Sequence, residues 1–227
     1  MTETTITVQG EYSAWYPAER ATVGASVHSY GAKRDTVFAK AVAASDAVRT
    51  LIEASYDKHD GPITWWSSES VRVWSERPWN NEGKQLAPVF HAALDFSAKF
   101  KDFEALARWV EAAAAITDVT VSSITWDLTE ATKTSATVEV RSRAVKDAIA
   151  KASVFAQSIG LGKVTATALA DPGMLGDPGA SPSPAPMFAS QRMVKASFDS
   201  GGGAPQLALK PEEIAVSSVV DARFVAS

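Results

Sequence analysis

The residues best suited to chemistry in this chain of 227 residues are three histidines and one short glycine–serine segment. His28, His59 and His91 do not form a metal-binding pattern such as His-Glu-x-x-His, so we interpret them as surface or hydrogen-bonded histidines. The segment Gly24-Ala25-Ser26-Val27-His28 begins like the nucleophile elbow of a hydrolase, but it has no second glycine. It also lies inside a predicted strand rather than at a strand–helix turn. No catalytic residue is therefore assigned.

Phosphate and metal chemistry find no better support in the sequence. Gly160-Leu161-Gly162-Lys163 precedes a predicted strand, whereas a phosphate cradle needs a helix whose N-terminus points at the anion. This segment is better explained as a structural turn. The chain has no cysteine, which excludes disulfides, thiolate metal sites and cysteine nucleophiles. We expect no metal and no cofactor.

The tryptophans of the predicted hairpin 63–100 are the least ordinary feature of the sequence. Consecutive residues of a strand face opposite ways, so Trp65 and Trp66 must lie on different faces. Helices covering one face, with the other tryptophan flat on the surface, would explain them without a function. Tryptophans beside arginines are also enriched at the centres of protein–protein contacts, and a platform for a sugar or an aromatic ligand is a third interpretation. The candidate interface or ligand surface consists of Trp65, Trp66, Arg72, Trp74, Arg77 and Trp79.

Charge and composition narrow the classes of partner. The net charge is −4 and the basic residues are scattered, whereas a nucleic-acid-binding protein normally has a basic stripe. We therefore expect no nucleic-acid partner. No stretch approaches the ~20 apolar residues of a membrane-spanning helix. The first residues, Met1-Thr2-Glu3-Thr4-Thr5, lack the basic and apolar regions of a signal peptide, so the sequence predicts a cytoplasmic protein.

The first half of the chain alternates between strand and helix periodicity. Alternating residues predict strands over 6–16, with a bulge or bend at Gly10, and over 21–28; the two strands are expected to form a hairpin that turns near Pro17-Ala18-Glu19. Helical spacing predicts a helix within 33–56. One long strand, 63–77, then pairs through a polar loop with a return strand, 89–100.

The second half begins with a helix from Phe103, for which Asp102 is the expected N-cap. A strand over 119–128 follows. Residues 133–141 fit either a strand or a helix, and we favour one long helix that ends at Gly160. Its expected stripe is Val138, Val145, Ile149, Ala152, Ala156 and Ile159.

The C-terminal part consists of two strands separated by a segment of different composition. Strands are predicted over 164–169 and 214–224. The segment 171–205, rich in proline, glycine and serine, is expected to be a flexible loop. The fold class is therefore α+β, with a curved, mostly antiparallel sheet, packed helices and the order β-β-α-β, β-α-β, α-β, long loop, β. Residues 1–227 are expected to form a single domain.

Several segments in combination resemble the SIMPL domain family, a bacterial family named after a mammalian signalling protein that associates with a pelle-like kinase. The opening Ile6-Thr7-Val8-Gln9-Gly10-Glu11 is similar to the first strand of that family, and Phe100-Lys101-Asp102-Phe103 to its entry into the second helix. The segment from Val145 to Leu161 resembles its alanine-rich helix. Leu209-Lys210-Pro211-Glu212-Glu213-Ile214 resembles its last strand entry, although Glu212 stands where the family usually has glycine.

The resemblance implies an α+β fold with a curved sheet, oligomerisation and an association with stress responses. It supplies no agreed catalytic residues, so none is transferred to this chain. We therefore expect a non-enzymatic SIMPL-type protein that forms homo-oligomers and has a role in stress protection. The alternatives are a small-molecule binding module that uses the tryptophan surface and an uncharacterised hydrolase.

Overall fold

The computed structural model describes residues 3–175, 188–189 and 207–227. They divide into two compact units, each an antiparallel sheet that packs against helices. The first unit comprises residues 3–18, 128–175, 188–189 and 212–227, and the second comprises 19–127 and 207–211. The predicted α+β class is confirmed, with two antiparallel sheets in place of the one predicted. Whether residues 1–227 form a single domain stays a prediction.

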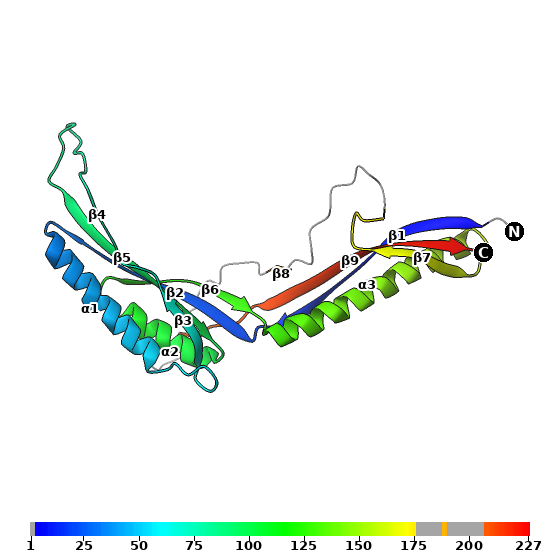
Figure 1. Cartoon of the computed structure of the whole chain (residues 1–227), viewed down its shortest axis with the longest axis horizontal. Coiled ribbons are helices and arrows are strands. Elements are labelled where there is room, and N and C mark those ends of the chain that lie inside the picture. Colours follow the sequence, from blue (N-terminus) through cyan, green and yellow to red (C-terminus); the bar gives the residue numbers. More distant parts are fainter. Residues whose placement is uncertain (1–2, 176–187, 190–206) are drawn as a thin grey trace. The chain divides into compact units, whose positions relative to one another are not determined.

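The first unit packs one long helix against a sheet of long strands (Figure 1). The strand order is β1-β9-β7, and β8 also pairs with β9. Its elements are β1 (Thr4–Pro17), α3 (Glu130–Ser158), β7 (Val164–Ala170), β8 (Phe188–Ala189) and β9 (Glu213–Ala226).

The predicted hairpin between the first two strands is wrong. All fourteen residues of β1 pair with β9, from Thr4 opposite Ala226 to Pro17 opposite Glu213. The second strand, β2 (Arg20–Gly31), lies between two other strands in the sheet of the second unit. The short link after Pro17 therefore joins two sheets instead of turning a hairpin, and the strand that completes the first sheet comes from the far end of the chain.

Of the bulge or bend predicted at Gly10, the bulge is wrong, because the β1–β9 ladder passes through Gly10, opposite Val220, without a shift in register. Instead, the absence of a side chain at Gly10 allows α3 to pack close to β1. A Cβ atom added to Gly10 would lie 2.1 Å from the carbonyl oxygen of Ala144 and 2.7 Å from the Cβ of Ala148. Only glycine leaves room for a helix backbone this close to a strand.

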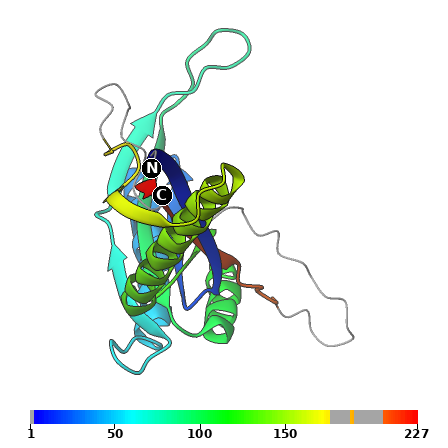
Figure 2. The same ribbon diagram turned by 90° about the vertical axis from the view of Figure 1, so that its right-hand side faces the viewer.

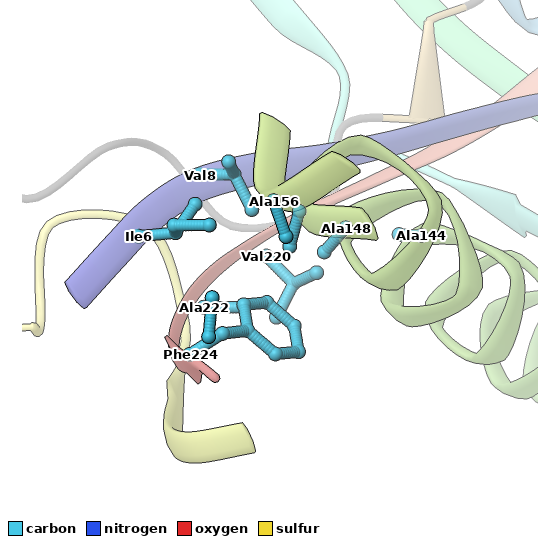
Figure 3. Close-up of a cluster of buried hydrophobic side chains, with 10 residues drawn as sticks. Ile6, Val8, Ala144, Ala148, Ala156, Val220, Ala222 and Phe224 are labelled. Carbon is cyan, nitrogen blue, oxygen red and sulfur yellow. The ribbon is translucent and has the colours of Figure 1, made fainter. Parts of the chain in front are cut away.

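The segment 133–141 is helical, as favoured from the sequence, and α3 ends before Gly160, whose φ of +80° suits a glycine after a helix. The predicted stripe is only partly right, because Val138, Ile149 and Ile159 are exposed. Alanines spaced four residues apart provide most of the buried face, where they meet apolar side chains of β1 and β9 (Figure 3). The buried positions are Ala136, Val140, Ala144, Ala148, Ala152 and Ala156.

The second unit also places its two helices against a sheet. The strand order is β3-β5-β2-β6, and β4 pairs with β5 beyond the end of β3. The loop between β4 and β5 projects beyond the sheet in both Figure 1 and Figure 2. Besides β2, the elements are α1 (Arg34–Glu53), β3 (Ile63–Ser68), β4 (Arg72–Glu76), β5 (Val89–Phe100), α2 (Phe103–Ala114) and β6 (Val119–Asp127).

Large side chains fill the core of this second unit. Phe100 is fully buried, and its ring lies 5.7 Å from that of Trp109 on α2. Leu106, on the same helix, is also fully buried. The predicted N-cap is confirmed, since the carboxylate of Asp102 accepts from the backbone N–H groups of Glu104 and Ala105 at 2.9 and 3.0 Å.

The single strand predicted over 63–77 is two strands. Ser68 lies opposite Phe96 and Arg72 opposite Ala93, so three residues of one chain segment (69–71) face two of β5 (94–95). This extra residue is a bulge, and it exchanges the two faces of the strand beyond it.

Part of the predicted loop 171–205 can be compared with the structure. Asp171 to Leu175 follow β7, and Phe188–Ala189 form β8 against β9, so a short strand lies inside the segment. The remaining residues, 176–187 and 190–205, lie outside the described residues. None of the helices in the described part of the chain is long and apolar enough to cross a membrane.

Candidate functional site

The face of the second sheet opposite α1 and α2 carries the candidate site. Along β2, Val23 and Val27 are buried on the helix side, while Ser26, His28 and Tyr30 alternate with them on the other side. Both helices of this unit pack on the buried side of the sheet (Figure 1). We call the opposite side the open face.

Four rings stand together on the open face, and we call them the aromatic row: His28, Tyr30, Trp74 and His91. Tyr30 and Trp74 lie directly opposite His91 on its two neighbouring strands. The ring centroids of Trp74 and His91 are 5.1 Å apart at an interplanar angle of 10°, and those of Trp74 and His28 are 5.8 Å apart at 2°. Tyr30 is 67% exposed and Trp74 43%, so the row presents aromatic surface to its surroundings.

The two histidines of the row are joined to each other. His28 Nε2 lies 3.2 Å from His91 Nδ1, and one of these nitrogens must donate while the other accepts. His91 Nε2, on a ring that is 13% exposed, lies 3.3 Å from Glu76 Oε1, without the angle of a hydrogen bond. If His28 donates to His91, the His91 proton is on Nε2 and faces this carboxylate. The interpretation of both histidines as surface or hydrogen-bonded residues is confirmed.

A second polar cluster lies beside the aromatic row. The carboxylate of Asp95 accepts a hydrogen bond from Ser26 Oγ and pairs with Arg72 Nη2 at 2.5 Å. Ser26 therefore directs its hydroxyl to a carboxylate and not to an imidazole, which does not resemble a serine–histidine nucleophile. Arg72 is held at a defined place on the open face, with about half of its side chain exposed.

The bulge in residues 69–71 decides which predicted site residues share a face. Trp65 lies opposite Lys99 on the open face, while Trp66 lies opposite Ala98 on the helix side. Without the bulge, Trp74 would join Trp66; with it, Trp74 lies on the open face, opposite His91.

The predicted site residues do not form one patch. Trp65 and Trp74 are separated by about eight residues along β5, roughly 27 Å. Trp79 is 68% exposed in the loop after β4 and lies outside the row. Arg77 is exposed just after β4. The structure thus brings Arg72 and Trp74 together, and adds Tyr30 and the two histidines, whose places in neighbouring strands are the only sequence signal that could have found them.

The other sequence motifs have structural roles. The backbone N–H groups of Gly162 and Lys163 both donate to the carbonyl of Ser227, so the glycine–lysine segment is a turn, as interpreted. His59 lies in a turn where the N–H groups of Asp60 and His59 donate to Asp57, and these bonds lower the pKa of the Asp57 carboxyl. Within the described residues, no cluster of three histidines or carboxylates could hold a metal ion.

The comparisons with known proteins match nearly the whole chain. The SIMPL family profile, described as a protein of unknown function (DUF541), matches residues 6–224. The chain belongs to the SIMPL family. No curated protein matches this SIMPL chain. A crystal structure of an uncharacterized conserved protein from Listeria innocua matches over 96% of the SIMPL chain and 92% of its own length, at 12% identity and a TM-score of 0.22.

Proposed function

We propose that this SIMPL protein acts as a non-enzymatic homo-oligomer and that copies associate through the open face around Trp74. The observation that carries the proposal is the aromatic row, where Trp74 and Tyr30 are exposed on the sheet face that α1 and α2 leave uncovered. Exposed aromatic residues on a sheet face are typical of protein–protein contacts.

The charges around the row favour a second copy as the partner. Arg72 and the two histidines lie on the same face as Asp95 and Glu76, so the face carries both signs of charge. A face with both signs can meet its own copy across a two-fold axis, because each charge finds an opposite charge in the partner.

The rigidity of the row also supports association. Trp74 stacks against the rings of His28 and His91, and Arg72 pairs with Asp95, so little side-chain freedom remains to be lost on binding. Truncating a buried tryptophan at an interface costs about 2 kcal/mol or more, which corresponds to more than a tenfold loss of affinity.

The mass of the protein in solution tests this proposal. In sedimentation velocity at tens of micromolar, the wild type should be oligomeric and Trp74→Ala should shift toward monomer while its circular dichroism melt stays cooperative. Trp79→Ala is the matched control, because it removes a more exposed tryptophan of the same hairpin from outside the row. A monomeric wild type, or an equal loss of mass in Trp79→Ala, would contradict the proposal.

Stress protection is the cellular part of the proposal, and it rests on the family resemblance alone. If the oligomer is the protective form, Trp74→Ala should both shift the protein toward monomer and reduce protection. Survival of cells that carry only Trp74→Ala, after an oxidant or heat challenge, measures this against cells with Trp79→Ala.

A small-molecule binding module is the second candidate, and a hollow in the first unit favours it. The hollow has a volume of about 300 Å³ and is lined by apolar side chains of α3, β7 and β9 together with Arg141 and Asp171. This is the lower end of the size range of small-molecule sites. If the wild type is monomeric, a ligand whose affinity falls in Arg141→Ala would favour this candidate.

A further inference from the structure

The outer edge of β1 is a long exposed strand edge. Within the described residues β1 pairs only with β9, so the other side of its fourteen residues faces no strand. At about 3.4 Å per residue this edge is roughly 45 Å long. Free edges of this kind pair readily with strands of other molecules unless the protein blocks them.

The geometry of the ladder shows which groups face outward. Alternate residues of an antiparallel strand present both their N–H and C=O groups to the same side. The N–H of Glu11 donates to a side chain of α3 instead of to β9, so the odd-numbered residues of β1 face the free edge. Ser13 and Trp15 are among them, and both are exposed.

Two charged side chains of α3 reach around this edge at its middle, and we call them the edge clip: Asp147 and Lys151. Asp147 Oδ2 accepts from the N–H of Glu11 at 2.9 Å, and Lys151 Nζ donates to the carbonyl of Gln9 at 3.1 Å. The two side chains also pair with each other at 2.8 Å, one helical turn apart.

The position of the edge clip follows from the close packing beneath it. Because Gly10 has no side chain, α3 crosses β1 with Ala144 and Ala148 against it, and this brings the next residues of the helix to the edge. The hydrogen bond from Lys151 and the bond from the Glu11 N–H lower the pKa of the Asp147 carboxyl. The bond to Asp147 raises the pKa of Lys151 in turn.

We propose that the edge clip keeps β1 from pairing with β1 of a second copy of this chain. Its acceptor and donor occupy the N–H of Glu11 and the C=O of Gln9, the two neighbouring groups that an added strand would need there. The clip thus replaces one residue of a partner strand and divides the edge into the short segments 4–8 and 12–17. This role is independent of the aromatic row, which lies in the other unit.

The test removes the clip in a background where the open face is already disabled. Asp147→Ala with Lys151→Ala is added to Trp74→Ala, and mass is measured by sedimentation velocity at tens of micromolar. We expect the mass at least to double. Glu104→Ala with Arg108→Ala is the matched control, because it removes a pair with the same four-residue spacing from α2, and its mass should not change.

A proline at the edge identifies how the copies associate. The N–H of Ser13 faces outward, so Ser13→Pro leaves the β1–β9 ladder intact but removes a donor that an added strand would use. Adding Ser13→Pro to the clip variant should restore the lower mass. Association that persists with Ser13→Pro would overturn the proposal, since the copies would then join elsewhere.

Two further results also test whether the edge clip prevents pairing of β1. A folded clip variant whose mass is unchanged, although amide exchange at Glu11 is faster than in the parent protein, would overturn the proposal. If the double substitution does not fold, Lys151→Ala alone frees the carbonyl of Gln9 and should still raise the mass at high concentration. An unchanged mass in that variant would overturn the proposal as well.

Discussion

Helix α3 of the first unit and helix α2 of the second pack on their sheets with side chains of different size. In the first unit, α3 meets β1 through alanines, and Gly10 lets the helix backbone come almost into contact with the strand. In the second unit, Phe100 and Trp109 hold sheet and helix apart and bury large aromatic surfaces. The comparison shows that side-chain size sets the distance between helix and sheet. This distance decides whether side chains of the helix can reach the backbone of the neighbouring strand.

The close approach in the first unit has a direct consequence. The carboxylate of Asp147 and the amine of Lys151, both on α3, reach the backbone of β1 because the helix lies against it. In the second unit the two helices cover one face completely enough to bury Val23, Val27 and Phe100, and the open face holds a row of rings. The unit with small side chains at its helix–sheet contact thus has a strand edge that the helix hydrogen-bonds. The unit with large side chains at this contact has an exposed aromatic face.

The largest expected effect is the loss of a large side chain from the second unit. Phe100→Ala should lower the free energy of unfolding by about 3–5 kcal/mol, because it removes a fully buried ring and leaves a cavity beside Trp109. Urea unfolding followed by circular dichroism measures this change. Phe38→Ala, at an exposed position of α1, is the control and should cost far less. Equal costs would show that the second unit does not depend on its large core residues.

The first unit should instead be sensitive to enlargement. Ala148→Leu should lower the free energy of unfolding by about 1–3 kcal/mol, because the added atoms have no space between α3 and the strand at Gly10. Ala150→Leu, at an exposed position of the same helix, tests whether leucine itself is tolerated there. A neutral Ala148→Leu, measured by urea unfolding, would mean that the helix can move away from β1 at little cost.

The smallest expected effect is the pH dependence of the edge clip. Since the pKa of Asp147 is lowered in the folded protein, its stabilisation is complete above the ordinary aspartate range and is lost as the pH falls through the lowered value. Since the pKa of Lys151 is raised in the folded protein, its contribution to the stability is complete below the ordinary lysine range. That contribution is lost as the pH rises through the raised value.

The measurement is the difference in melting temperature between the wild type and Asp147→Ala. It should stay constant from weakly acidic to weakly alkaline pH and shrink in stronger acid. A difference that is already falling near neutral pH would contradict the lowered pKa of Asp147.

Much of the fold could be predicted because it depends on local patterns. Asp102 precedes a helix at the spacing of an N-cap, and Gly160 follows one, so both ends were found from neighbouring residues alone. The alternation in 89–100 and 214–224 predicted strands that the structure contains. The partner of β1 could not be found in this way, because β9 lies about two hundred residues away and nothing local distinguishes it from β2.

The candidate site was predictable only in part, and the reason is the register. Arg72 and Trp74 were recognised by residue type, but the bulge at 69–71 places Trp74 opposite His91 and on the other face from Trp66. Because one extra residue exchanges the faces of a strand, no pattern of residue types within a single strand could reveal the aromatic row.

By itself, the sequence determined the elements of this protein: which segments are strands or helices, where most of them end, and that the chain is an α+β protein of the SIMPL family. Only the tertiary structure decided that β1 and β2 belong to different sheets, that Gly10 admits α3, and that Asp147 and Lys151 occupy the edge of β1. The physical reason is the separation along the chain over which each kind of interaction acts. Periodicity, capping and turn preference act between neighbours in the chain, whereas pairing, register and close packing depend on residues that meet only after folding.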